Sequence, residues 1–243
     1  MKTDRYKAIL LAAGLGTRLR PITETVPKCM VEIGGKPLLE WWLLRLESSG
    51  CSEVIVNTHY LHKIVNTYLR SRKKTEMVVH AIHEPELLGT AGTLMANKEF
   101  FSGCTGALIH ADNAMEEGLI ELLSTHRERK KGCIMTMLTF RCGNPSSCGI
   151  VEVDSSGTMI GFHEKVKSPP GNLANGAVYI FDSELFNEIE KIVEAPRDFS
   201  IEVLPTLSGR VQTWEAKGFY IDIGTPETLE IARKKWQGFY GEQ

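Results

Sequence analysis

A glycine-rich turn directly after an apolar run is the feature that most constrains the fold of this chain. Residues 8–13 predict a buried strand, and Gly14 and Gly16 then open a turn that ends in Arg18. The backbone N–H groups of such a turn, together with a fixed cation, can surround a polyphosphate. Lys28 follows a proline-containing loop and can fold back onto the same anion. The sequence therefore predicts a strand and turn that bind a nucleoside triphosphate.

Two familiar glycine-rich motifs do not fit this turn. The dinucleotide-binding fingerprint needs a third glycine at the position of Leu19. The ATPase P-loop ends in Gly-Lys-Ser or Gly-Lys-Thr, which this turn does not have. A purely structural turn is the remaining alternative. Arg18 and Lys28 disfavour it, because two cations beside one turn need an anionic partner.

The composition is that of an ordinary globular protein. The chain of 243 residues can bury a large core, and its net charge of −2 gives no field that attracts nucleic acid. No apolar run reaches the ~18 residues that a membrane span needs. From the polar start at residues 1–7 we expect no secretory signal. The six cysteines have no zinc-finger spacing, so we expect free thiols and a cytoplasmic location.

Strand-like and helix-like segments alternate through the first half of the chain. Apolar runs and helical spacing predict strands at 54–56, 77–82, 107–110 and 133–140, and helices at 37–49 and 61–69. The second half predicts an antiparallel hairpin (149–153 and 159–162), strands at 177–181 and 219–223, and helices at 183–193, 199–207 and after Pro226. We therefore expect an α/β fold: a single Rossmann-like three-layer domain with a mixed, mostly parallel central sheet and an inserted antiparallel subregion.

A longer pattern surrounds the turn. Residues 11–28 read Leu-Ala-Ala-Gly-x-Gly-Thr-Arg-Leu-x-Pro-x-Thr-x-x-x-Pro-Lys, and residues 35–38 read Gly-Lys-Pro-Leu. This pattern resembles the signature of the sugar-1-phosphate nucleotidyltransferases, the nucleotide-sugar pyrophosphorylases. The resemblance implies a mainly nucleotide-binding half at 1–140, a mainly sugar-binding half at 141–225 and a C-terminal helix at 226–243. It also implies that the nucleotide is bound by Leu11, Ala12, Ala13, Gly14, Gly16, Thr17, Arg18 and Lys28.

A second loop of small residues follows the expected strand at 77–82. Glu84 precedes Gly89 and Thr90, the first two residues of a Gly-Thr-Ala-Gly run. Taken alone, this segment is an ordinary loop leading into a helix. The resemblance implies that these three residues hold the nucleobase, and the Gly-Thr-Ala-Gly form resembles the mannose-1-phosphate or heptose-1-phosphate guanylyltransferases. GTP is therefore the favoured nucleotide, with UTP or CTP as the alternatives.

Two aspartates at strand ends can hold a metal ion. Asp112 follows the strand at 107–110, where a parallel sheet places ligand-binding groups, and Asp222 lies in an apolar strand, where a buried carboxylate needs a partner. Taken alone, Asp112 is more typical of a helix cap or a turn than of a binding site. The resemblance implies that the pair binds Mg²⁺, and Asp112 the nucleotide as well. The chain departs from the family at Ala111, where the family has glycine and where a methyl group narrows the space beside the ribose.

The sugar side of the resemblance lies in the second half of the chain. Gly149 matches a glycine that lies against the pyranose, and Asn175 matches a residue that faces the sugar. Glu164 and Lys165 match a pair that binds the sugar hydroxyls and the sugar phosphate. Taken singly, the pair is also typical of a solvated hairpin end, and Asn175 of a turn.

Together these motifs imply an enzyme that joins an NTP to a sugar 1-phosphate and releases pyrophosphate. The expected catalytic residues are Arg18, Lys28, Asp112 and Asp222. The expected partners are the two small-molecule substrates, with neither nucleic acid nor a membrane, and a homodimer is left open. A non-catalytic nucleotide-sugar-binding regulatory subunit is the alternative, and Leu19 disfavours a nicotinamide-dependent dehydrogenase. The sequence does not identify the sugar.

Overall fold

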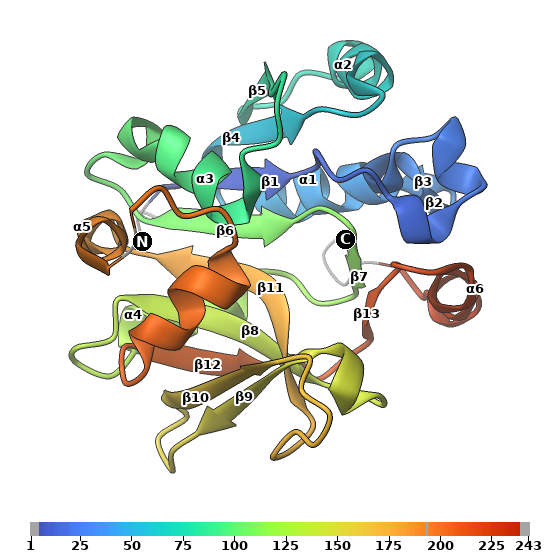
Figure 1. Ribbon diagram of the computed structural model, residues 1–243. Helices are drawn as coiled ribbons and strands as arrows, with labels where there is room; N and C mark the ends of the chain where they lie inside the picture. Colours follow the sequence, from blue (N-terminus) through green and yellow to red (C-terminus); the bar gives the residue numbers. More distant parts are fainter. Residues whose placement is uncertain (1–4, 193, 239–243) are drawn as a thin grey trace. The chain divides into compact units, whose positions relative to one another are not determined.

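The computed structural model describes residues 5–192 and 194–238, which form two compact units made of interleaved segments (Figure 1). Unit 1 contains residues 5–87, 109–119 and 218–238, and unit 2 contains residues 88–108, 120–192 and 194–217. We expected a mainly nucleotide-binding half, 1–140, to be followed along the chain by a mainly sugar-binding half, 141–225. The number of domains that fold independently stays a prediction.

Unit 1 is built on three parallel strands, β1 (Tyr6–Leu11), β4 (Cys51–Thr58) and β5 (Val78–His83). Helix α1 (Leu38–Ser48) packs against β4, and α2 (His62–Ser71) packs against β5 (Figure 1). Its other elements are η1 (Thr17–Leu19), η2 (Ile22–Glu24), η3 (Lys28–Met30), β2 (Glu32–Ile33), β3 (Lys36–Pro37), β7 (Asn113–Met115), β13 (Tyr220–Asp222) and α6 (Pro226–Lys235). β13 pairs antiparallel with β7, which joins the late part of the chain to the segment after His110.

Unit 2 contains a mixed set of strands. β8 (Met135–Arg141) is antiparallel to β11 (Leu173–Phe181) and parallel to β12 (Val211–Glu215). β9 (Gly149–Val153) is antiparallel to both β10 (Met159–Glu164) and β11. Its helical elements are α3 (Gly89–Ala96), η4 (Lys98–Phe101), α4 (Ile120–Glu128), η5 (Pro145–Ser147), α5 (Glu184–Ile192), η6 (Phe199–Val203) and η7 (Leu204–Leu207). β6 (Gly106–His110) contributes residues to both units.

The structure confirms the α/β class and the mixed strand directions, and it shifts several element boundaries. The helix expected at 199–207 is a π-helical turn followed by a 3₁₀ turn. Pro205 has no N–H to donate within a regular α-helix, so this segment cannot continue as one. α6 begins at Pro226 behind the Thr225 cap and ends at Lys235. The parts of the expected helices at residue 193 and residues 239–243 lie outside the described residues.

Among the described residues, no helix is both long and apolar enough to cross a membrane.

A buried histidine ties α4 to the strands of unit 2. His126 is 3% exposed and lies between Thr136 and Asp182. Because a carboxylate oxygen only accepts, Nε2 donates to Asp182 Oδ1 (3.3 Å) and Nδ1 accepts from the Thr136 hydroxyl (3.0 Å). Burial and the nearby Arg129 charge lower the pKa of His126 to about 4, although Asp182 opposes the shift. His126 is therefore neutral in the folded protein near pH 7.

We expect His126 to make folding sensitive to mild acid. Its ordinary pKa is 6.5, so below that pH the unfolded chain binds a proton that the folded chain excludes. The stabilisation is complete above about pH 6.5 and is lost as the pH falls toward about 4. Urea unfolding should show that the wild type loses about 1 kcal/mol more than a His126→Gln variant between about pH 7.5 and about pH 5.5. Equal losses in the two proteins would contradict this account.

Candidate active site

The turn after β1 is shaped by one glycine and left open by another. Gly16 has φ of +64°, and an added Cβ would lie 2.9 Å from Thr23 Cγ2. Thr23 Oγ1 also donates to the Gly16 carbonyl (2.7 Å), which fixes the turn ahead of Arg18. At Gly14 an added Cβ would meet nothing within 4 Å. Gly14 is thus not required by local packing, and its bare backbone leaves room for a ligand to approach.

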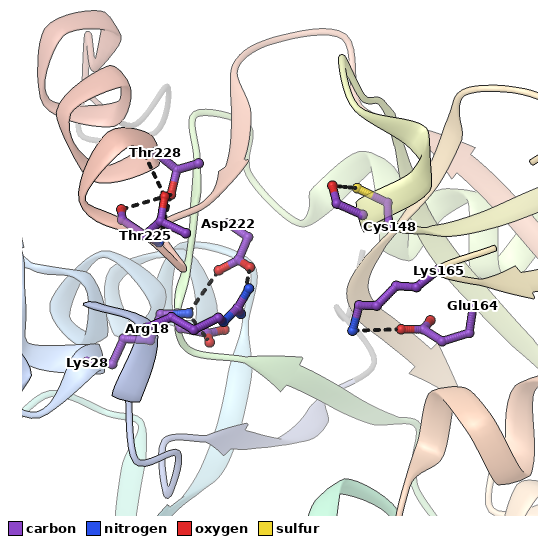
Figure 2. Close-up of polar contacts among 10 residues, drawn as sticks. Arg18, Lys28, Cys148, Glu164, Lys165, Asp222, Thr225 and Thr228 are labelled. Carbon is purple, nitrogen blue, oxygen red and sulfur yellow. Dashed lines mark hydrogen bonds and ion pairs between the residues drawn. The ribbon is translucent and has the colours of Figure 1, made fainter. Parts of the chain in front are cut away.

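The four residues expected to be catalytic lie together in unit 1. Lys28 Nζ contacts Asp112 Oδ2 at 2.6 Å and Asp222 Oδ1 at 2.9 Å, and Arg18 Nη2 lies 3.7 Å from Asp222 Oδ2. Figure 2 shows the Lys28 and Arg18 side chains reaching the same carboxylate of Asp222. The pairing of Asp222 with Asn113 between β13 and β7 brings the two aspartates together across more than a hundred residues of sequence.

The expectation that Asp222 is a buried carboxylate is wrong. Its side chain is 48% exposed, whereas that of Lys28 is 10% exposed. β13 has only three residues, and side chains alternate along a strand, so Ile223 turns into the core and Asp222 turns outward. The carboxylate is held by the two cations rather than by burial.

The electrostatics of this group favour the charged forms of Lys28 and Asp112. Burial alone would lower the pKa of Lys28, but Asp112 and Asp222 outweigh it and raise that pKa above its usual value. Burial alone would raise the pKa of Asp112, but Lys28 and His110 outweigh it and lower that pKa. The side chains of Asp112 and Asp222 thus converge on one ammonium group, that of Lys28.

A divalent cation fits the position that this ammonium occupies. Two carboxylates that converge on one positive charge are the protein ligands that Mg²⁺ commonly uses beside substrate phosphates. Within the described residues, no group of three or more His, Cys, Asp or Glu side chains is arranged to hold a metal. Further ligands must then come from a phosphate-bearing substrate or from water.

Sequence reasoning missed Asn57, which connects two of the predicted nucleotide-binding segments. Asn57 Oδ1 accepts a hydrogen bond from the Ala12 N–H (2.7 Å), and Asn57 Nδ2 donates to Glu84 Oε1 (3.1 Å). Asn57 and Glu84 are both almost fully buried, and Asn57 lies near the end of β4. An asparagine at the end of the apolar run 54–56 was the available signal, because a buried amide needs partners.

Gly224 is a second missed position. A Cβ at this residue would lie 2.9 Å from both Arg18 Nη2 and Asp222 Oδ2. The absence of a side chain at Gly224 therefore leaves the space in which the guanidinium and the carboxylate meet. Its place directly after the strand residue Ile223 gave no indication of this role.

Gly89 and Thr90 open α3 in unit 2 and contact the chain near Phe199. Gly89 has φ of +82°, and a Cβ there would lie 2.4 Å from the Arg197 carbonyl oxygen. Thr90 Oγ1 accepts a hydrogen bond from the Phe199 N–H (2.8 Å). The hydroxyl that we expected to face a nucleobase thus already supports the backbone, and it retains its own proton to donate.

Three of the expected sugar-binding residues meet on the β9–β10 hairpin. Gly149 pairs with Glu164, and a Cβ at Gly149 would lie 2.6 Å from Glu164 Oε2. Lys165 adopts a positive φ of 48° just after β10, and its Nζ lies 3.0 Å from Glu164 Oε1 (Figure 2). The missing side chain of Gly149 makes room for the carboxylate, and the carboxylate orients the ammonium.

Asn175, the fourth, lies on β11 beside this hairpin, because Ala174 pairs with Ile150 of β9. Its Oδ1 accepts from the Ala177 N–H (2.8 Å), and its Nδ2 donates to the Tyr179 hydroxyl (2.7 Å). The register between β11 and β8 shifts between Asn175 and Tyr179, so the strand bulges here. Asn175 therefore has both ends of its amide fixed by its own strand.

Ala111, which stands where the family has glycine, is buried inside the protein. Ala111 is 0% exposed, and its N–H donates to the Leu11 carbonyl oxygen (3.1 Å). Its methyl group is packed in the interior rather than projecting into open space. The alanine therefore does not line the surface formed by Lys28 and the aspartates.

Comparison with known proteins identifies relatives over most of the chain. A mannose-1-phosphate guanylyltransferase catalytic subunit beta of Drosophila pseudoobscura pseudoobscura is 31% identical over 227 residues, which are 91% of this chain and 60% of that protein. A mannose-1-phosphate guanylyltransferase of Mycobacterium tuberculosis is 28% identical over 233 residues, 93% of this chain and 63% of that protein. The solved structure of HddC from Yersinia pseudotuberculosis complexed with GMP-PN has a TM-score of 0.77 and 25% identity, covering 95% of this chain and 99% of that one.

The chain thus spans about three fifths of the length of these two curated relatives. The solved structure, in contrast, matches it over nearly its whole length and confirms the fold. Residues 7–237 match the nucleotidyl transferase family, a range that includes every residue placed in the site above. The chain belongs to the nucleotidyl transferase family.

Proposed function

We propose that this chain transfers GMP from GTP to a sugar 1-phosphate, giving a GDP-sugar and pyrophosphate. The observation that carries the proposal is the meeting of Lys28 and Arg18 with Asp112 and Asp222. Such a cluster can neutralise a triphosphate and a divalent cation together. The match to the nucleotidyl transferase family supports the same reaction.

The reaction needs positioning and charge rather than a protein nucleophile. An oxygen of the sugar phosphate attacks the α-phosphorus in line, and the bond from that phosphorus to the pyrophosphate oxygen breaks with its electron pair. Arg18 stabilises the leaving pyrophosphate, Lys28 the α-phosphate and Lys165 the incoming sugar phosphate. Fixed cations at these points lower the barrier because charge moves onto the pyrophosphate as the bond breaks.

Asp112 and Asp222 would hold the metal ion in this proposal. Mg²⁺ supplies positive charge to the phosphate oxygens when it is bound. The carboxylates already converge on one cation, so they need no large rearrangement to accept another. With a metal held there, Lys28 would be available to contact the α-phosphate.

Glu84 supports guanine as the base. Guanine presents two adjacent donors, N1–H and the 2-amino group, and a carboxylate is an acceptor-only group that matches them. Glu84 is buried, and its Oε1 accepts from Asn57 Nδ2 (3.1 Å), so its carboxylate has a fixed orientation. Uracil and cytosine lack this pair of adjacent donors. The guanylyltransferases among the relatives support the same choice.

The sugar would be bound by Gly149, Glu164, Lys165 and Asn175. We take a mannose 1-phosphate as the first candidate because two relatives carry that name, with other hexose or heptose 1-phosphates as alternatives. A regulatory subunit that binds a nucleotide sugar without turnover is the second candidate. Retention of all four charged residues, Lys28 and the three around it, disfavours it. Six free cysteines support a cytoplasmic location.

The direct test is a pyrophosphate-release assay with GTP, UTP, CTP and dTTP against a panel of sugar 1-phosphates in the presence of Mg²⁺. We expect turnover with GTP, at least about tenfold faster at low substrate concentration than with any other NTP. Turnover with UTP but not with GTP would refute the guanosine assignment. Binding of a nucleotide sugar without any turnover would favour the regulatory subunit.

A Glu84→Gln variant sharpens the base assignment. The amide replaces one acceptor by a donor, so the preference for GTP over UTP in kcat/KM should fall by about 10–100-fold. The matched control is Glu86→Gln, a change at a neighbouring exposed glutamate. An unchanged preference in Glu84→Gln would remove Glu84 from base recognition.

Asp222→Asn should abolish most of the activity without unfolding the protein. The change removes a metal ligand and the partner of both cations, so we expect kcat to fall by about 10²–10³-fold. Because the side chain is 48% exposed, the melting temperature should stay near that of the wild type. Activity within about twofold of the wild type would exclude Asp222 from the site.

Lys28→Met tests whether the ammonium occupies the metal position. Without it, Asp112 and Asp222 repel each other, and a divalent cation should bind them about tenfold more tightly than in the wild type. Titration with Mn²⁺ followed by electron paramagnetic resonance measures this affinity in the absence of nucleotide. A Lys28→Met, Asp112→Asn double variant should lose the gain. Equal affinity in Lys28→Met and in the wild type would contradict the interpretation.

A further inference from the structure

The amide of Asn175 is held in one orientation by two hydrogen bonds. Its Oδ1 accepts from the Ala177 N–H at 2.8 Å, and its Nδ2 donates to the Tyr179 hydroxyl at 2.7 Å. After these bonds, one N–H and one oxygen lone pair of the amide are left for a ligand. A flipped amide would set its NH₂ group against the Ala177 N–H, two donors facing each other, so the observed orientation is the stable one.

Tyr179 is built into the core and has a fixed position. It is 0% exposed, and its ring packs against that of Phe199 with centroids 5.0 Å apart. Burial raises the pKa of its hydroxyl, while hydrogen bonds with Asn175 and Ser200 act in the opposite direction. The hydroxyl therefore stays protonated, with its oxygen accepting from Asn175.

The same segment of chain that contacts Tyr179 also supports the loop at the start of α3. Phe199 donates its backbone N–H to Thr90 Oγ1 (2.8 Å), and Ala91 donates to the Arg197 carbonyl oxygen (2.9 Å). Asp198 Oδ1 accepts hydrogen bonds from the N–H groups of Ser200 (2.8 Å) and Ile201 (2.9 Å), and these bonds fix the turn that follows Asp198. Residues 197–200, which we call the support segment, thus touch the predicted base loop and the tyrosine behind Asn175.

We infer that Tyr179 is a positioning residue for the sugar 1-phosphate. Its hydroxyl accepts the Nδ2 hydrogen bond that anchors the Asn175 amide, while the Ala177 N–H sets which end of the amide carries the oxygen. The support segment fixes Tyr179 with the same residues that hold Thr90. Tyr179 contacts no substrate in this role and acts through Asn175. The inference rests on the proposed function, and it assigns sugar selectivity to a residue behind the binding surface.

The test is Tyr179→Phe, which removes the hydroxyl and keeps the buried ring. We expect the KM for the sugar 1-phosphate to rise by about tenfold, with kcat and the KM for GTP within about twofold of the wild type. Discrimination between sugar 1-phosphates that differ in one hydroxyl should fall as well. Ser200→Ala should change the sugar KM in the same direction by about threefold, because it loosens Tyr179 and leaves the Asn175 bond in place.

Tyr6→Phe is the matched control. Tyr6 is 1% exposed, and its hydroxyl lies 2.7 Å from Ser49 Oγ, so the change removes a comparable buried hydrogen bond in unit 1. Both variants should lower the melting temperature, because each loses a buried hydrogen bond. The sugar KM should stay unchanged in Tyr6→Phe, which separates a general loss of stability from the positioning role of Tyr179. An unchanged sugar KM in Tyr179→Phe, or an equal rise in the KM for GTP, would overturn the inference. A wild-type protein that forms no nucleotide sugar overturns the proposed function, and this role with it.

Discussion

The bridge from Lys28 to Asp112 and Asp222 is the interaction on which the rest of the site depends. The two carboxylates come from segments of unit 1 that lie more than a hundred residues apart in the sequence, and the pairing of β13 with β7 brings them to one place. Two such groups repel unless a cation lies between them. The ammonium of Lys28 supplies that charge, and it explains why a partly exposed Asp222 still has a defined position.

This arrangement connects folding to chemistry. A cation that balances two carboxylates can be replaced by another of higher charge, and the released lysine then has no anionic partner except the substrate. The turn after β1 serves the same end, because Gly16 and Thr23 fix the backbone that places Arg18. The charges of the site are thus arranged before substrate binds, which is how preorganised sites lower a barrier in which charge moves.

Strand β1 and the turn after it could be predicted from local sequence, because strands and glycine turns leave short-range patterns. The burial of Asp222 was predicted wrongly, since an apolar run does not reveal that a strand has three residues and one outward face. Asn57 and Tyr179 were not assigned roles for a different reason. Each acts through a partner that folding brings to it, Glu84 and Asn175 respectively, and no spacing rule marks such supporting residues. The π-helical turn at Phe199 likewise depends on Asp198 and Pro205 rather than on periodicity.

The central claim is that the ammonium of Lys28 and a divalent cation share one position between Asp112 and Asp222. Crystals grown with Mn²⁺ and a non-hydrolysable GTP analogue would test it most directly, because anomalous scattering locates the metal. The account predicts Mn²⁺ bound by both carboxylates, with Lys28 moved from the aspartates to a phosphate oxygen. Metal bound elsewhere, or Lys28 still bridging the two aspartates beside a bound nucleotide, would contradict it.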